Sequence, residues 1–150
     1  MTPITRDFTV AVFVVHNDHV LLHPHRKLGI WLPPGGHIEP HELPDEAALR
    51  EVEEESGLLV ELVGGYGVEI HDPGAPRQLV RPEGIQLEDI SPGHQHIDLI
   101  YYARPVDASP DELPPLIDDM RWLQEADFAT IDLTDEVATW ARQALAAFRR

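Results

Sequence analysis

A proline-glycine loop followed by a glutamate-rich segment is the feature that most constrains how this chain folds. Residues 33–36 read Pro-Pro-Gly-Gly, a rigid lead followed by two residues free to adopt positive φ, so they form a loop. Pro44 suits the first turn of a helix, and Gly57 is well placed to end it. The sequence therefore predicts a loop at 33–36 and a helix from Pro44 to Ser56.

Four glutamates lie within five positions near the end of that predicted helix. Glu51, Glu54 and Glu55 stand at i, i+3 and i+4, so their carboxylates share one face, and Glu53 adds charge beside them. Like charges at this spacing destabilise a helix unless they are solvated or neutralised by cations. Carboxylates on a rigid element are ligands that hard cations such as Mg²⁺ prefer, whereas a solvated acidic face is the alternative for an isolated stretch.

The loop and the glutamates belong to one longer pattern of fixed spacing. Its members, in order, are Gly36, Glu42, Arg50, Glu51, Val52, Glu54, Glu55, Gly57 and the aliphatic Leu58. This pattern resembles the Nudix box, and on these residues the chain is identified as a member of the Nudix hydrolases. The resemblance implies an α+β Nudix fold, in which a mixed β-sheet is sandwiched between α-helices (an α/β/α sandwich). Periodicity alone supports only a mixture of helices and strands.

The resemblance also implies a metal site. Glu51, Glu54 and Glu55 would hold a divalent cation, Mg²⁺ with Mn²⁺ as a substitute, and the Gly35 carbonyl would be a further ligand. Glu51 and Glu54 are thereby expected to be catalytic. The implied reaction is the attack of a metal-activated water on one phosphorus of a diphosphate.

Two further box residues, Arg50 and Glu42, are implied to be catalytic. Arg50 would orient a box carboxylate through a charge-assisted bond, and Glu42 would brace the loop against the helix. A purely structural ion pair is the open alternative for both. The general base is either Glu51 or an acidic residue outside the box. The outside candidates, each also explained as a surface charge, are Glu83, Glu88, Asp111, Glu112, Asp118 and Asp119.

Candidate substrate-binding residues lie outside the box. His94, His96 and Asp98 alternate into a predicted strand, so they project to one face and could reach substrate or an additional metal. Histidines hydrogen-bonded at a strand end are the alternative. Four cations, which could instead be exposed solubilising charges, are candidates to offset substrate phosphates: Arg26, Lys27, Arg77 and Arg81. Trp31 could stack on a base or belong to the core.

Alternation and turn residues predict the remaining elements. An apolar strand over 8–15, a turn at Asn17-Asp18 and a strand at 20–22 are predicted to form a hairpin. Residues 72–95 form a proline- and glycine-punctuated excursion that contains one short hairpin. The other predicted strands cover 58–63, 66–70, 97–103 and 120–123, and a helix covers 134–150.

Bulk properties narrow the class of function. A length of 150 residues predicts a single domain over residues 1–150, and a formal net charge of −16 argues against binding nucleic acid through a broad basic face. The absence of cysteine excludes disulfides and thiolate metal sites. No signal peptide or membrane span is predicted, so a cytoplasmic location is the default expectation. The Nudix resemblance adds a homodimer as an expectation.

The resemblance leaves the substrate open. The favoured reading is a nucleoside diphosphate linked to another moiety, such as ADP-ribose or a nucleotide sugar, because a proline some fifteen residues beyond the box marks many ADP-ribose pyrophosphatases and Pro73 lies there. The first alternative is a MutT-like (deoxy)nucleoside triphosphate pyrophosphohydrolase that sanitises modified nucleotides. The second is a non-catalytic nucleotide sensor, which would have no need of three clustered carboxylates.

Overall fold

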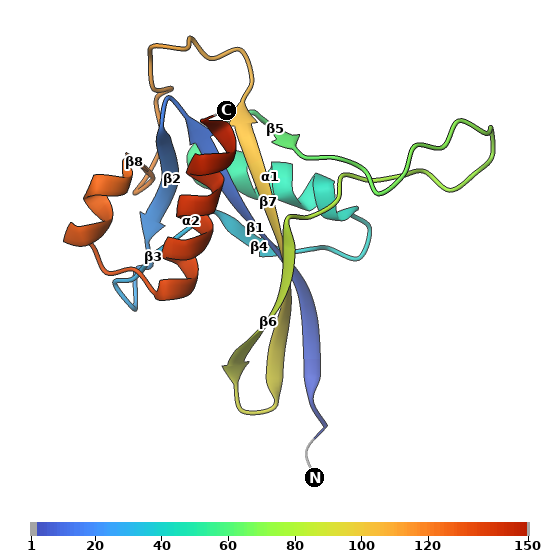
Figure 1. Cartoon of the computed structure of the whole chain (residues 1–150). Helices are drawn as coiled ribbons and strands as arrows, with labels where there is room; N and C mark the ends of the chain where they lie inside the picture. The colour runs from blue at the N-terminus through green and yellow to red at the C-terminus, as the bar shows by residue number, and fades with distance from the viewer. Residues whose placement is uncertain (1–2, 150) are drawn as a thin grey trace.

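The computed structural model describes residues 3–149, which form one mixed β-sheet with helices on both sides (Figure 1). The strands are β1 (Thr5–His16), β2 (His19–Pro24), β3 (Trp31–Leu32), β4 (Gly35–His37), β5 (Val60–Val63), β6 (Gly84–Ser91), β7 (His94–Pro105) and β8 (Arg121–Leu123). The helices are α1 (Pro44–Ser56), the 3₁₀ segment η1 (Glu125–Thr130) and α2 (Asp135–Phe148). The main path of the sheet runs β3-β2-β1-β7-β5, with β4 paired to β1, β6 to β7 and β8 to β2.

Strand β1 lies at the centre of two hydrophobic layers. Val10, Val12 and Val14 pack on the side of α1, whereas Phe13 and Val15 pack on the side of α2. This division follows from the alternation of side chains along a strand, and it explains why residues 10–15 are apolar at every position. In Figure 1, α1 lies behind the sheet and α2 lies in front of it. The predicted mixed sheet between helices is confirmed.

Helix α1 has the predicted bounds. It begins at Pro44, where the Glu46 carboxylate accepts a 2.8 Å hydrogen bond from the Leu43 backbone N–H. It ends at Gly57, which adopts φ 79°, the left-handed conformation that glycine takes without strain. One face of the helix buries Ala47, Ala48 and Val52 against the sheet and leaves the glutamates on the other side.

The predicted hairpin at Asn17-Asp18 is present, whereas the hairpin predicted within 72–95 extends beyond that range, because its second strand is β7. Asn17 and Asp18 take φ 48° and 59° between β1 and β2, as a tight turn with two left-handed residues requires. Strands β6 and β7 form the hairpin of the excursion, with Gly93 at φ 80° in its turn. Strand β7 runs from His94 to Pro105 and is therefore longer than the predicted 97–103.

The predicted strand at 66–70 is wrong. Tyr66, Val68 and Ile70 alternate as a strand would, but all three side chains are exposed and no strand pairs with them. The free edge of β7 is already divided between two partners, since β6 pairs with its first half and β5 with its last four residues. No place is left on that side of β7, and the segment belongs to the excursion, which in the structure covers residues 64–83.

The terminal helix α2 begins after Thr134, whose hydroxyl accepts a hydrogen bond from the Val137 backbone N–H at 3.3 Å. It packs Ala141, Ala144 and Leu145 onto the sheet. Within residues 3–149, neither this helix nor another has the length and apolar character needed to cross a membrane.

Candidate active site

Two glycines let the loop after β3 approach both the sheet and α1. A Cβ at Gly35 would collide with the backbone oxygen of Val10, because β4 pairs closely with β1. A Cβ at Gly36 would lie 2.5 Å from Oε1 of Glu51. Glycine is therefore required at Gly35, where the obstacle is backbone, and the absence of a side chain at Gly36 makes the space in which the Glu51 carboxylate lies.

Arg50 ties the loop to the glutamates of α1. Its Nε and Nη2 donate to the two carboxylate oxygens of Glu42 at 2.7 and 2.8 Å, a bidentate pair. Its Nη1 donates to Glu51 at 2.9 Å and to Glu54 at 3.2 Å, and Nη2 also donates to the His37 carbonyl at 3.0 Å. The hydrogen bonds from Arg50 lower the pKa of Glu42 to about 2. The predicted bracing contact between Glu42 and the helix is present in this geometry.

Glu55 is the glutamate most affected by its surroundings. Burial, followed by the charge of Glu51, raises the pKa of Glu55 to about 8. The Gly35 backbone N–H donates to Oε2 of Glu55 at 3.4 Å. The neighbouring carboxylates of Glu51 and Glu55 cannot both remain charged at low cost unless a cation lies between them. The donors are all oxygen, so the pair fits a hard divalent cation such as Mg²⁺.

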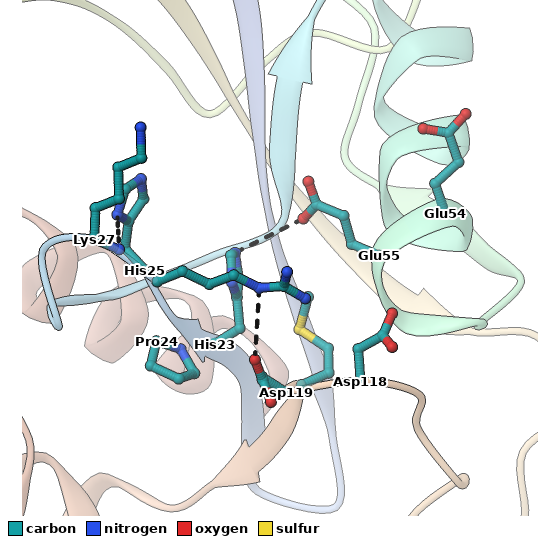
Figure 2. A pocket seen from close by; sticks show the side chains of 10 residues that line it. His23, Pro24, His25, Lys27, Glu54, Glu55, Asp118 and Asp119 are labelled. Atoms are coloured by element: carbon teal, nitrogen blue, oxygen red, sulfur yellow. Dashed lines mark hydrogen bonds and ion pairs between the residues drawn. The ribbon is translucent and has the colours of Figure 1, made fainter.

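Glu54 is the most exposed of the three glutamates. Its side chain is 59% exposed and accepts from Nη1 of Arg50, the same nitrogen that donates to Glu51, and Figure 2 shows it directed away from Glu55. The structure brings the three predicted ligands onto one turn and a half of α1. Glu51 links the other two, because it shares Arg50 with Glu54 and its charge raises the pKa of Glu55.

A pocket of about 620 Å³ opens beside Glu54 and Glu55 (Figure 2). Its other walls are the end of β2, the following turn and the segment before β8: His23, Pro24, His25, Arg26, Lys27, Asp118, Asp119 and Met120. His23 Nε2 lies 3.8 Å from Oε2 of Glu55, and Arg26 Nε lies 3.9 Å from Oδ2 of Asp119. Burial lowers the pKa of His23, which keeps its imidazole neutral at pH 7.

A second pocket, of about 340 Å³, adjoins the first, because His23, His25 and Glu55 line both. It lies over β1, β4 and β6, and its polar wall includes Gln86, Glu88, His96, Asp98 and Glu136. Asp98 accepts a 2.8 Å hydrogen bond from the Thr9 hydroxyl, and burial raises its pKa to about 6. Burial and then the neighbouring His37 lower the pKa of His96. Glu55 thus stands at the junction of a pocket that holds Arg26 and Lys27 beside its carboxylates and a pocket whose lining has acidic residues but no lysine or arginine.

The predicted substrate-binding residues divide into three groups. Arg26 and Lys27 line the first pocket, and His96 and Asp98 line the second. His94 lines neither; its Nε2 lies 3.2 Å from Oδ2 of Asp7.

Arg77 and Arg81 lie on the excursion and line neither pocket. Arg77 is exposed beside Leu43 and Asp45 at the start of α1, and the Arg81 backbone bonds to Gly65. This placement lends no support to a phosphate-binding role for either arginine.

The candidate general bases outside the box also differ in which pocket, if any, they line. Asp118 and Asp119 line the first pocket with Glu54 and Glu55, and Glu88 lines the second. Three other candidates line neither pocket: Glu83, Asp111 and Glu112.

Several pocket residues were not among the predicted site residues. They are His23, His25, His37, Gln86 and Glu136. His37 directly follows the glycine pair, and that position was the available signal for it. Glu136 lies in the first turn of α2, a place where an acidic residue is explained by the helix dipole alone. Trp31, in contrast, packs on the α2-side core.

The NUDIX domain family model matches residues 5–148, so the chain belongs to the Nudix family. A NUDIX-family hydrolase from Clostridium perfringens superposes with a TM-score of 0.79 at 36% identity, covering 97% of this chain and 99% of that one. The family and the fold expected from the box are both confirmed.

Two relatives with named activities match over shorter segments. The 8-oxo-dGDP phosphatase NUDT18 of Mus musculus is 44% identical over 63 residues, which are 40% of this chain and 20% of that protein. A putative 8-oxo-dGTP diphosphatase of Bacillus subtilis (strain 168) is 34% identical over 64 residues, 41% of this chain and 43% of that protein. The matched segments thus span a fifth and less than half of these relatives.

Proposed function

We propose that this protein hydrolyses the diphosphate linkage of a nucleoside diphosphate joined to another moiety, with ADP-ribose-like compounds and nucleotide sugars as the favoured class. One observation carries this proposal: Glu55 stands where two adjoining pockets meet. A substrate with a group on each side of its diphosphate would place one group in each pocket and the scissile linkage beside the glutamates.

Charge supports the same arrangement. Arg26 and Lys27 lie on the wall of the first pocket, where they offset phosphate charge. The second pocket is lined by Glu88, Asp98 and Glu136, which repel phosphate and suit a group rich in N–H and O–H donors, such as a base or a sugar. The first pocket also holds carboxylates, but it is the one of the two with an arginine and a lysine, so the diphosphate would extend toward it once a cation offsets the glutamates.

Glu51, Glu54, Glu55 and the Gly35 carbonyl would hold the cofactor, Mg²⁺ or Mn²⁺. When bound, the cation supplies positive charge at the phosphates and promotes attack of water on phosphorus. Arg50 fixes the Glu51 carboxylate, and Glu42 in turn fixes the arginine, so both are positioning residues. Asp118 and Asp119 face the glutamates across the first pocket and are, with Glu51, the candidates to accept a proton.

The second candidate function is pyrophosphohydrolysis of a modified (deoxy)nucleoside triphosphate. It is favoured by the names of the mouse and Bacillus relatives, which refer to 8-oxo-dGDP and 8-oxo-dGTP. The substrate would then be a small nucleotide as well, bound with its base in the second pocket.

A substrate panel with Mg²⁺ distinguishes these candidates by their products. We expect ADP-ribose or a nucleotide sugar to yield a nucleoside monophosphate and a sugar phosphate, measured by phosphorus NMR. Faster turnover of 8-oxo-dGTP, with release of pyrophosphate, would establish the second candidate instead. Absence of turnover with every diphosphate compound would overturn both.

A further inference from the structure

Three histidines and an aspartate gather on one face of the sheet, outside the glutamate set. They are Asp7 of β1, His37 of β4, and His94 and His96 of β7. The strand registers bring them together, since Asp7 pairs with His96 and Thr9 pairs with His37. Alternate residues of a strand share a face, so Asp7, Thr9 and the two β7 histidines point the same way. The backbone of three strands fixes this cluster.

We infer that Asp7, His37 and His96 form a site for a divalent transition-metal ion such as Zn²⁺, with His94 as a fourth ligand. One ligand atom from each of the first three residues lies within 4.8 Å of the others. Ligands bound to one zinc at ~2.1 Å stand roughly 3.4 Å apart, so rotations of the side chains suffice to close the site. The imidazole of His96 lies beside both neighbours, with ring centroids 5.0 Å from His37 and 5.3 Å from His94.

His94 is held between Thr5 and Asp7. The Thr5 hydroxyl lies 2.8 Å from Nδ1 of His94, and Nε2 of the same ring lies 3.2 Å from Oδ2 of Asp7. When Nδ1–H donates to the Thr5 oxygen, Nε2 keeps the lone pair that a metal ion requires and directs it toward the Asp7 carboxylate.

His37 makes the same approach from the other side. Its Nε2 also lies 3.2 Å from Oδ2 of Asp7, so one carboxylate oxygen faces two imidazole nitrogens. A metal ion shared by the carboxylate and the imidazoles satisfies all of these contacts at once. The Thr5 contact then acts as an outer partner that fixes the ring orientation, as is common for metal-binding histidines.

The donor set separates this site from the glutamate set. Imidazole nitrogen with one carboxylate suits Zn²⁺, Co²⁺ or Ni²⁺, whereas Mg²⁺ prefers oxygen donors throughout. His37 and His96 also line the second pocket, so the ion would stand in the wall of that pocket and offset its acidic residues. The site does not depend on the proposed hydrolysis.

The experiment measures Zn²⁺ binding to the untagged full chain by calorimetry in a large excess of Mg²⁺, which saturates the glutamates. We expect one Zn²⁺ per chain, and a visible absorption band when Co²⁺ is the probe. The double variant His37→Ala/His96→Ala should weaken Zn²⁺ binding at least about tenfold and abolish the cobalt band. Asp7→Asn, which keeps the shape of the side chain, should also weaken binding.

The matched control is His71→Ala, because that imidazole is 86% exposed on the excursion and lies outside the cluster. It should bind Zn²⁺ as the unmodified chain does. Circular dichroism without metal verifies that each variant is folded. No Zn²⁺ binding in excess Mg²⁺ would overturn the proposal. So would unchanged affinity in the folded double variant, which would move the ion to other ligands such as His23 and His25.

Discussion

Arg50 is the side chain that connects the loop after β3 to the glutamates of α1. It bridges Glu42, Glu51 and Glu54 and reaches the His37 carbonyl, so the loop and helix meet on one guanidinium. Replacing it would leave Glu42, which is only 8% exposed, without its partner. Arg50 either positions Glu51 for catalysis or only stabilises the fold as an ion pair, and replacing it distinguishes these two roles.

Substitution Arg50→Gln is predicted to lower kcat about 10–100-fold, as is typical when a partner that orients metal ligands is removed. The melting temperature should fall by about 5 °C, because hydrogen bonds to charged groups contribute about 1.5–3 kcal/mol each. Arg104→Gln is the control, since Arg104 makes an exposed ion pair with Glu61. Unchanged kcat with a lowered melting temperature would reduce Arg50 to a structural ion pair.

Asp98 is predicted to make stability depend on pH. Its pKa is raised to about 6 in the folded chain from 3.8, so between these values the folded state retains a proton that the unfolded state has lost. Stability from this group is therefore full below pH 4 and declines as pH rises to about 6. The Asp98→Asn variant, which keeps the bond from Thr9, should be more stable by about 1–3 kcal/mol at pH 8.

Urea unfolding of the unmodified chain and Asp98→Asn across pH 4 to 8 measures this difference. The two curves should converge at pH 4, separate between pH 4 and about 6, and keep a constant separation above that pH. If the difference in unfolding free energy between the two proteins grew toward low pH, it would have the wrong sign. That result would contradict the claim that burial raises the pKa of Asp98.

At the scale of elements, the close approach of β4 to α1 determines where Glu51 can lie. A Cβ at Gly36 would stand 2.5–2.9 Å from the Glu51 carboxylate, so Gly36→Ala should displace that carboxylate. Misplacing a catalytic group by about 1 Å costs about 100-fold in rate, and we expect a loss of that order in kcat. Gly65→Ala is the control, because a Cβ there meets no atom within 4 Å. Equal activity of the two folded variants would contradict the predicted role of the loop.

The sequence predicted some elements well because their signals are local. Pro44 and Gly57 bound α1, and the spacing of Glu51, Glu54 and Glu55 needs only the helical repeat to place them on one face. The pockets could not be predicted in the same way. Glu136 and Asp98 come together only through α2 packing on β7, and no local pattern records that contact.

The strand predicted at 66–70 failed for a related reason. Alternation describes the side chains of a strand, but it does not say whether an edge is free to pair with it. The same limitation affects Arg77 and Arg81, whose positive charge suited phosphate although the excursion holds them outside both pockets.

At the scale of the whole molecule, a net charge of −16 should make stability sensitive to salt in two separable ways. Sodium chloride screens general repulsion, whereas Mg²⁺ at equal ionic strength should add a specific increment. At 100 times its Kd the increment is about 2.7 kcal/mol, or about 5–10 °C in melting temperature. The triple variant Glu51→Gln/Glu54→Gln/Glu55→Gln should lose this increment and keep the sodium chloride response. Equal Mg²⁺ increments in both proteins would place the cation elsewhere.

The most direct test of metal-dependent diphosphate hydrolysis compares two neighbouring glutamates of α1. Glu53 and Glu54 are both exposed, but only Glu54 belongs to the proposed ligand set. Turnover of the best diphosphate substrate with Mg²⁺, followed by phosphorus NMR, should fall at least about 100-fold in Glu54→Gln and stay within about twofold in Glu53→Gln. Equal turnover by the two variants would contradict the assignment of the chemistry to this face of α1.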